Sequence, residues 1–183
     1  MKLQKLEIPG LILITPDIYR DGRGFFLETF RAVSYKEILG VDFVQDNMSF
    51  SRYGTIRGLH FQEAPHAQAK LIRCVWGRIL DVAVDLRAGS KSFGRHASVE
   101  LDAREQRQFF LPAGFAHGFA VLSPEAIVEY KCDNYYEPTA DAGLRYDDPC
   151  LSIDWQIPPE KVSVSPKDAG LPNWEQIFAT KED

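Results

Sequence analysis

Three ionisable side chains with the means to move a proton and hold a charge lie close together in strand-like sequence. They are Arg57, His60 and Lys70, within the segments Ile56-Arg-Gly-Leu-His-Phe-Gln62 and Lys70-Leu-Ile-Arg73. A lysine inside a fold needs an anion, either a carboxylate or an oxyanion that develops during a reaction. A neighbouring histidine can accept a proton at neutral pH. The pattern therefore favours proton transfer beside a developing negative charge, whereas His60 alone could equally be a core histidine bonded to the backbone.

A second group of polar residues is suited to binding an anion. Arginine, carboxylate and amide side chains follow a glycine-containing loop: Arg23, Glu28, Gln45, Asn47 and Arg57. Arginine binds phosphate or pyrophosphate through paired hydrogen bonds. The sequence has no Walker loop and no dinucleotide glycine fingerprint, so a nucleotide would be held by side chains. The alternative is that these are ordinary surface residues.

Two later segments could complete a site. His117 lies in the glycine-containing turn 111–119 and either bonds across that turn or lines a pocket opposite His60. Tyr130 follows an apolar run, so strand alternation points it inward, where its hydroxyl needs a partner or acts as an acid or base. The pair Tyr135-Tyr136 could stack on a flat base or simply pack.

Other classes of function are disfavoured. The histidines have no His-x-His pair, so a metal site built from His60, His66 and His117 with Glu28 or Glu63 is not expected. A net charge of -5 argues against sequence-blind nucleic-acid binding. No run reaches the roughly 18 apolar residues of a membrane span, and the N-terminus lacks a signal-peptide stretch. Three cysteines at no metal-like spacing suit packing in a reducing compartment, so we expect a cytoplasmic protein.

Many short strands must position these residues. Strand-like runs with turn signals between them are 56–61, 70–75, 78–86, 96–101, 107–111, 118–122 and 126–132. This spacing is typical of a sandwich or barrel, so we expect an all-β jelly roll with a few short helices. Gly94, Gly114 and Gly118 are predicted positive-φ or close-approach positions.

The flanking regions complete one predicted domain over 1–183. We expect strand, bend and strand over 6–14, a loop over 15–24, and strand-like segments at 25–30 and 43–50. A helix is predicted from Ser34 as cap to Gly40 as stop. The tail, residues 150–183, is predicted to wrap the core and end in a short helix near 173–179.

The combined motifs resemble those of a known family. They are Asp21–Glu28, Gln45–Asn47, Ile56–Gln62, Lys70–Arg73, Asp81–Arg87, Ser92–Gly94, Pro112–Phe119, Tyr130-Lys131, Tyr135-Tyr136 and Ser165–Asp168. Over roughly residues 8–172 the chain resembles the dTDP-4-dehydrorhamnose 3,5-epimerases, cupin-type jelly rolls that work as homodimers without metal or organic cofactor. The resemblance implies epimerisation at C3 and C5 of dTDP-4-dehydro-6-deoxy-D-glucose, a step of dTDP-rhamnose biosynthesis.

The resemblance also implies residue roles. His60 is the base, Asp168 supports it, Lys70 stabilises the enolate oxygen, and Tyr130 is the acid on the other face of the sugar. Residues at family positions for the nucleotide-sugar are Arg23, Glu28, Gln45, Asp46, Asn47, Arg57, His117, Asp141 and Lys167, with Tyr136 stacking on thymine. The apolar N-terminal strand could pair across subunits of the implied homodimer.

The chain departs from the usual family pattern at Ala69, Asp141 and Tyr146, where Gly, Glu and Trp are common. These positions leave the catalytic groups in place but bear on substrate choice. One alternative is therefore an epimerase acting at a single carbon of a related dTDP-ketosugar. Others are a non-catalytic sugar-nucleotide-binding cupin and a metal-dependent cupin oxygenase.

Overall fold

Two antiparallel sheets form the body of the protein in the computed structural model, which describes residues 1–178. The first sheet contains, in spatial order, β1 (Lys2–Lys5), β2 (Ile12–Thr15), β10 (Gln108–Leu111), β7 (Lys70–Trp76), β12 (Glu125–Cys132) and β5 (Gln45–Arg52). The second contains β13 (Asp141–Gly143), β6 (Ile56–Gln62), β11 (Phe115–Val121), β8 (Arg78–Asp85) and β9 (His96–Asp102). The expected all-β jelly roll with a few short helices is confirmed.

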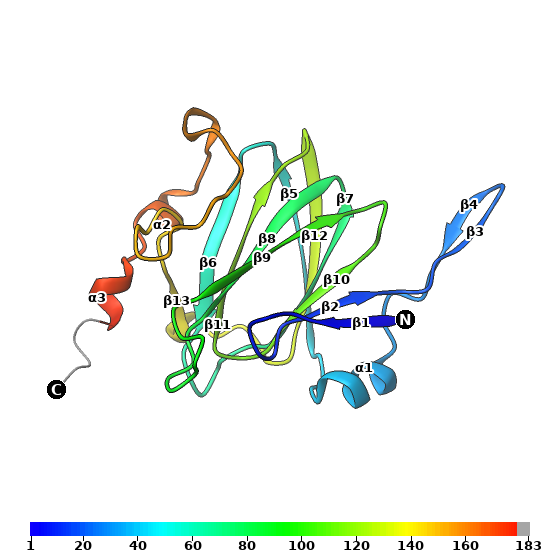
Figure 1. Ribbon diagram of the computed structural model, residues 1–183, viewed down its shortest axis with the longest axis horizontal. Helices are drawn as coiled ribbons and strands as arrows, with labels where there is room; N and C mark the ends of the chain where they lie inside the picture. Colours follow the sequence, from blue (N-terminus) through cyan, green and yellow to red (C-terminus); the bar gives the residue numbers. More distant parts are fainter. Residues whose placement is uncertain (179–183) are drawn as a thin grey trace.

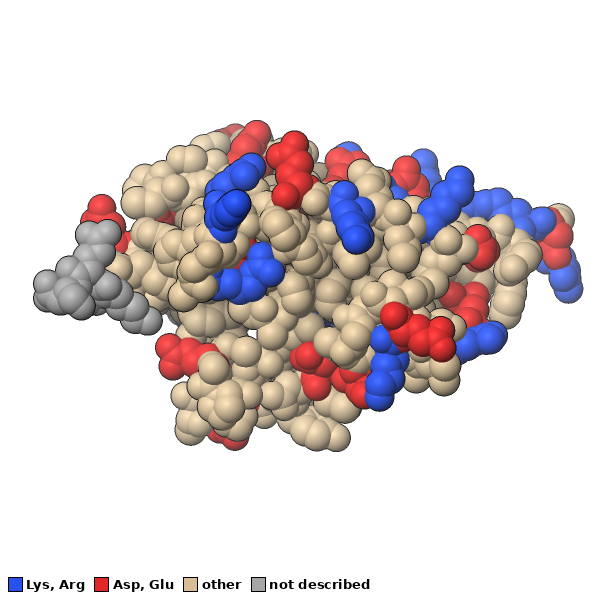
Figure 2. Space-filling view, turned by 60° about the horizontal axis from the view of Figure 1, so that its bottom comes forward, with Lys and Arg blue, Asp and Glu red and all other residues tan. Residues whose placement is uncertain are grey.

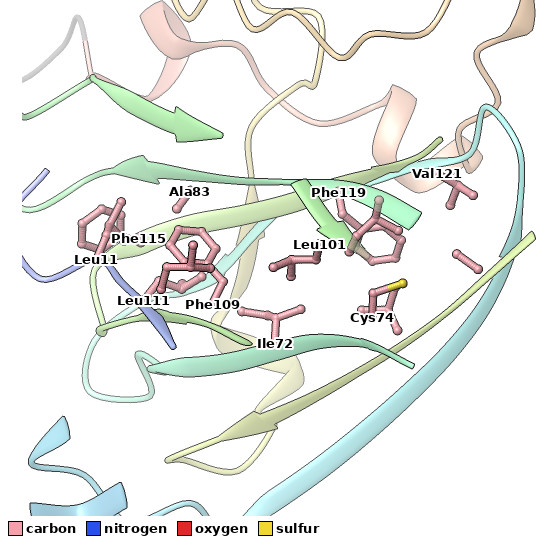
Figure 3. Close-up of a cluster of buried hydrophobic side chains, with 14 of the residues drawn as sticks. Leu11, Ile72, Cys74, Ala83, Leu101, Phe109, Leu111, Phe115, Phe119 and Val121 are labelled. Carbon is pink, nitrogen blue, oxygen red and sulfur yellow. The ribbon is translucent and has the colours of Figure 1, made fainter. Parts of the chain in front are cut away.

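Apolar side chains fill the space between the sheets (Figure 3). Phe109, Leu111 and Phe115 are almost completely buried there. Fully burying one such side chain contributes about 1.5–3 kcal/mol. This core holds the two sheets together, and with them the strands that carry the polar residues.

The remaining elements lie at the ends of this body. A hairpin of β3 (Tyr19–Asp21) and β4 (Gly24–Phe26) projects from it (Figure 1). The helices are α1 (Ala32–Leu39), α2 (Pro166–Ala169) and α3 (Trp174–Phe178), with short 3-10 turns at Pro138–Ala140 and Pro159–Lys161. On the side of the molecule opposite the hairpin, α2 and α3 lie beside the second sheet (Figure 1).

The predicted strands after residue 56 are all present, with ends shifted by up to three residues. Gly94 and Gly114 have φ of 77° and 90°. Gly118 is a close-approach position, since a Cβ there would lie 2.7 Å from the Arg57 carbonyl oxygen of β6.

Predictions in the N-terminal part were less accurate. The helix begins at Ala32, so Ser34 lies inside it and Arg31 precedes it without a side-chain cap. Gly40 does end it, in the left-handed conformation at φ 76°. The expected loop 15–24 contains β3 because the glycine-rich turn after Asp21 reverses the chain into β4. The strand expected over 25–30 ends at Phe26.

The first expected strand lies earlier than predicted, at Lys2–Lys5, and pairs with β2 of the same chain. The tail runs along the second sheet, with a bridge between Ser163 and Thr55. The predicted C-terminal helix is present as α3, where Trp174 and Phe178 pack on Phe93. Residues 179–183 of the predicted tail lie outside the described residues, so the single domain over 1–183 stays a prediction.

The described residues 1–178 contain no helix long and apolar enough to cross a membrane. On the face shown in Figure 2, acidic and basic side chains are interspersed rather than gathered by sign.

Candidate active site

A cavity of about 380 Å³ opens between the two sheets near one end of the jelly roll. Its lining combines three strands of the first sheet, three of the second, and α2. The residues concerned are Gln45, Asn47, Ser49, Arg57, His60, Phe61, Gln62, Gln68, Lys70, His117, Phe119, Tyr130, Cys132, Tyr136, Asp141 and Lys167. Eight of the fourteen predicted binding and catalytic residues lie more than 30 positions from His60 in the sequence. Ten of the fourteen nevertheless line this one cavity.

His60 forms a histidine–carboxylate pair with Asp168. The imidazole Nε2 lies 2.7 Å from the Asp168 carboxylate, and the other carboxylate oxygen accepts a 3.3 Å hydrogen bond from the Gly58 amide. In the neutral imidazole, Nε2–H donates to Asp168 and the lone pair is on Nδ1. Burial lowers the pKa of His60, and Asp168 opposes that shift. The ring is therefore neutral and basic near neutral pH, and fixed in one tautomer.

Asp168 reaches His60 because α2 is anchored at its start. Ser165 precedes the helix, and its hydroxyl accepts a 3.0 Å hydrogen bond from the Asp168 amide. Pro166 at the first helical position suits this N-terminus. A four-residue helix thus presents a buried carboxylate to the second sheet.

Lys70 is a buried ammonium that forms no ion pair with any residue of 1–178. It is 7% exposed, and its Nζ donates one long hydrogen bond, 3.4 Å, to the His60 carbonyl oxygen. Burial lowers the pKa of Lys70, while Cys132 and the carboxyls of Asp81 and Asp141 act in the opposite direction. A charge held this way has unused capacity to bind an anion entering the cavity.

Tyr130 faces the cavity from the first sheet, whereas His60 belongs to the second. It is aligned with Ile72 of β7, and the neighbouring Cys132 with Lys70. Tyr130 and Lys70 therefore approach the cavity from the same sheet. Burial raises the pKa of Tyr130, so the phenol carries its proton over the neutral range. A base and an acid thus lie on two sides of one space.

His117 lies beside His60 on the neighbouring strand, so the expectation that it lines the cavity from the opposite side was wrong. Nor does it bond across its own turn. Its Nε2 contacts both carboxylate oxygens of Asp81 on β8 at 3.0 Å. Asp81 is fully buried, and burial raises its pKa against the effect of His117. The cavity therefore holds a second histidine–carboxylate pair.

Strand alternation on β5 separates its polar residues into two sets. Gln45, Asn47 and Ser49 line the cavity. Asp46 points to the other side of the sheet, where its carboxylate pairs with Lys131 at 2.9 Å. The expectation that Asp46 joins the site with its neighbours is therefore not met, because successive strand residues face opposite ways.

Arg57 lines the same cavity and has no carboxylate partner within the described residues. Its Nε donates to the Ser51 hydroxyl at 2.9 Å and its Nη2 to the Phe50 carbonyl at 3.3 Å. These bonds orient the guanidinium while leaving donors for an anion.

Tyr136, Asp141 and Lys167 form a connected group at the cavity mouth. The Tyr136 hydroxyl donates to Asp141 at 3.1 Å, and Lys167 forms an ion pair with the same carboxylate. Tyr136 is 52% exposed, so a flat ligand can reach its ring. Tyr135 does not line the cavity.

Arg23 and Glu28 lie away from the cavity. Arg23 sits in the turn of the projecting hairpin (Figure 1), 92% exposed, and pairs with Asp21. Glu28 pairs with Arg31 beside α1. Within one chain these two predicted ligands cannot complete the site around His60.

Sequence reasoning missed several cavity residues. Asp81, Ser49, Gln68 and Cys132 all lie at or behind the cavity wall. Cys74 and Cys132 are buried as expected, but Cys150 is exposed. The signal available for Ser49 was its two-residue spacing from Asn47, while nothing local marks Asp81 as the partner of His117.

In residues 1–178, no group of three or more His, Cys, Asp or Glu side chains is arranged to hold a metal ion. The ionisable groups at the cavity instead include two histidine–carboxylate pairs, the phenol of Tyr130 and the unpaired ammonium of Lys70. Together the fold and the cavity define a cupin-type jelly roll equipped for acid–base chemistry on an anionic ligand.

Comparison with known proteins gives the family. The family model described as dTDP-4-dehydrorhamnose 3,5-epimerase matches residues 5–176. A dTDP-4-dehydrorhamnose 3,5-epimerase of Methanothermobacter thermautotrophicus is 47% identical over 176 residues, covering 94% of this chain and 92% of the relative. The chain belongs to the dTDP-4-dehydrorhamnose 3,5-epimerase family.

Two solved structures are also similar. The dTDP-6-deoxy-D-glucose-3,5-epimerase of Legionella pneumophila, in complex with dTDP-4-keto-L-rhamnose, matches with a TM-score of 0.92 and 46% identity, covering 97% of this chain and 95% of that one. A 3'-monoepimerase of Streptomyces bikiniensis, in complex with dTDP-quinovose, matches with a TM-score of 0.83 and 36% identity, covering 92% and 85%.

Proposed function

We propose that this protein epimerises dTDP-4-dehydro-6-deoxy-D-glucose at C3 and C5 to give dTDP-4-dehydro-L-rhamnose, in dTDP-rhamnose biosynthesis. Both carbons are next to the C4 ketone. Removing a proton from either gives an enolate with its charge on the C4 oxygen, and returning a proton from the other side inverts the centre. The single observation that carries this proposal is the buried, unpaired Lys70 ammonium beside the His60–Asp168 pair.

His60 takes the proton through its neutral imidazole, and Asp168 stabilises the imidazolium that forms. Lys70 binds the oxygen on which charge develops, at no reorganisation cost because the ammonium is already in place. Tyr130 returns a proton from the other sheet. Its raised pKa keeps that proton available through the neutral range.

The nucleotide lies at the polar end of the cavity. Arg57 binds the diphosphate, since its guanidinium is oriented by Ser51 and forms no ion pair with a carboxylate of residues 1–178. Gln45 and Asn47 supply amide groups to the nucleotide-sugar, His117 contacts the sugar, and the thymine stacks on Tyr136. Asp141 and Lys167 support that end of the site through their bond to the Tyr136 hydroxyl and to each other.

Proton–deuterium exchange tests the reaction directly. The full chain is incubated in D₂O with dTDP-4-keto-6-deoxyglucose, and NMR reads C3 and C5 separately. The native protein should exchange both positions, and His60→Ala should abolish both. The control His96→Ala removes a histidine that does not line the cavity and should exchange at the native rate. Exchange retained in His60→Ala would contradict the assignment.

The same experiment separates the alternatives. Deuterium at one carbon only would indicate a single-centre epimerase, the activity named for the Streptomyces relative. Binding of dTDP without exchange would indicate a non-catalytic sugar-nucleotide-binding cupin. We propose no cofactor: activity should survive dialysis against a chelator, and loss that added metal restores would revive a metal-dependent cupin.

The protein acts as a homodimer, in which Arg23 and Glu28 reach the cavity of the other copy. This arrangement reconciles their expected role with their distance from His60 in one chain. Exposed apolar side chains support it: Met48, Phe50 and Phe26, on the outer side of β5 and on the hairpin, are 67%, 51% and 70% exposed. β2 is already paired on both sides, so the N-terminal contribution would come from the β1 edge. Three free thiols fit a cytoplasmic location.

A further inference from the structure

Two glutamine side chains hold the backbone around Tyr136 at the cavity mouth. Gln45 Oε1 accepts a 2.9 Å hydrogen bond from the Tyr136 amide. Gln62 Nε2 donates to the Tyr135 carbonyl at 3.1 Å, and Gln62 Oε1 accepts from the Glu137 amide at 2.7 Å. Because Gln45 is on β5 and Gln62 is on β6, one loop of three residues is fastened to both sheets.

The Gln62 amide is fully used by the protein. It is 6% exposed, and its Nε2 also donates to the His66 carbonyl at 2.7 Å. Both amide hydrogens and the carbonyl oxygen therefore have protein partners. Turning toward a ligand would leave at least one buried backbone group unpaired, which is costly. Gln62 thus acts through the loop and not by touching a substrate.

The position of Gln62 joins this loop to the rest of the site. Its neighbour on β13 is Asp141, which accepts the hydrogen bond of the Tyr136 hydroxyl. Tyr136 is therefore held at two points. Gln45 bonds its backbone and Gln62 bonds the backbone of the residues on either side of it, while Asp141 bonds its hydroxyl. Two residues along the same strand lies His60.

We propose that Gln62 is a positioning residue for nucleotide binding, which fixes Tyr136 as a rigid stacking platform for the base. This proposal rests on the proposed function, in which the thymine stacks on Tyr136. A platform that is ordered before binding does not lose conformational freedom when the ligand arrives. Without Gln62 the loop must be ordered by the ligand, so affinity falls while the positions of His60, Lys70 and Tyr130 do not change.

The test is Gln62→Met, which keeps side-chain length and removes all three hydrogen bonds. Its matched control is Gln106→Met, since Gln106 is also 6% exposed and bonded to a backbone carbonyl, that of Ala103 at 2.6 Å, but does not line the cavity. Calorimetry measures dTDP binding to each full-length variant, and steady-state kinetics with dTDP-4-keto-6-deoxyglucose separates kcat from KM. Gln62→Met should weaken dTDP binding and raise KM about tenfold, the ratio that corresponds to one lost buried interaction. Its kcat should stay within about twofold of native, and Gln106→Met should match native in all three.

A second background distinguishes positioning of Tyr136 from a general structural role. In Tyr136→Ala the platform is absent, so adding Gln62→Met should cause no further loss of dTDP affinity. Should Gln62→Met fail to fold, Gln62→Glu keeps the acceptor for the Glu137 amide, loses both donors when ionised, and should show the same change in KM.

Unchanged dTDP affinity in a folded Gln62 variant would overturn the proposal. So would a fall in kcat equal to the fall in kcat/KM, or full additivity with Tyr136→Ala. Failure of the proposed function has a different signature, because it is seen in the native protein, which would then fail to exchange protons at C3 and C5 whether or not it binds dTDP.

Discussion

His60 is a base whose strength is set by two opposing surroundings. Burial lowers its pKa below the ordinary 6.5, and Asp168 pulls it back upward. The protonated imidazole cannot accept a proton, so kcat/KM should fall as pH drops through this lowered pKa, with a midpoint below 6.5. This acid limb of the pH profile reports the pKa of His60 in the free enzyme.

Asp168→Asn should move this acid limb to still lower pH, because the variant loses the negative charge that favours the imidazolium. It should also lower kcat by about 10²–10⁴-fold, the range typical of general acid–base catalysis. The pH profile of kcat/KM measures both effects. Asp147→Asn, which breaks an exposed pair with Arg145, is the control and should leave the limb unmoved. A limb that shifts upward in Asp168→Asn would contradict the role of Asp168.

Replacing Lys70 with an apolar residue should lower activity and raise stability. Lys70→Met should lower kcat by about 10²–10³-fold, as loss of one oxyanion donor does. The same change should raise the free energy of unfolding by on the order of 1 kcal/mol, since it removes an unpaired buried charge. Urea denaturation at neutral pH measures the gain.

The pH dependence of that gain has a definite sign. The folded-state pKa of Lys70 is lowered from 10.5, so between the two values the unfolded chain binds the extra proton. Native stability therefore rises with pH in that window, and the advantage of Lys70→Met should shrink as pH approaches 10.5. Lys131→Met, at an exposed pair with Asp46, should show no such gain. A native-like kcat in Lys70→Met would contradict the proposal that Lys70 stabilises the enolate oxygen.

The residues that could be predicted from sequence are those whose chemistry is hard to explain together by packing alone. His60, Lys70 and Tyr130 were selected by residue type and strand alternation, with the family resemblance giving their roles. The Asp81–His117 pair could not be found this way. The two residues are 36 positions apart. An aspartate in the apolar run of β8 has no identifiable partner in the sequence until the neighbouring strand is known.

At the scale of elements, period-two alternation decides which side chains share a space. It predicted Tyr130 correctly, and applied to β5 it would have separated Asp46 from Gln45 and Asn47. The helix start was misplaced because Ser34 matched a capping pattern that the chain does not use. The hairpin was missed because its strands are three residues each, too short for alternation to register.

The start of α2 is the element-level feature on which the catalytic base depends. Ser165→Ala removes the hydroxyl that accepts a hydrogen bond from the Asp168 amide. Losing a helix cap of this kind lowers the free energy of unfolding by about 1 kcal/mol. Because α2 has only four residues, the loss falls on the placement of Asp168. We expect kcat to fall by up to about fivefold, the equivalent of 1 kcal/mol, and the acid limb to shift toward lower pH.

Ser165→Thr keeps a capping oxygen and should restore both values. The matched control is Ser152→Ala: the Ser152 hydroxyl donates a hydrogen bond to the backbone carbonyl of Pro149, and Ser152 does not line the cavity. If Ser165→Ala left kcat and the limb at native values, Asp168 would be positioned by the sheet alone.

At the scale of the whole molecule, Arg23 in the projecting hairpin and Glu28 beside α1 both lie away from the cavity of their own chain. In the proposed homodimer, each site takes His60 from one chain and Arg23 from the other. His60→Ala and Arg23→Ala should then each lower activity as pure proteins. Co-expressed in equal amounts, they should form heterodimers in which one of the two sites is intact.

Random pairing makes half of the dimers mixed, so about one quarter of all sites should be native in such a preparation. Activity near that fraction, carried by a dimer in light scattering, is the expected result. A matched mixture of His60→Ala with Tyr130→Phe should recover nothing, because both changes fall in the same chain's half of the site. Absence of recovery with Arg23→Ala, or a monomer by light scattering, would place the hairpin outside the active site and leave its exposed Phe26 without a role there.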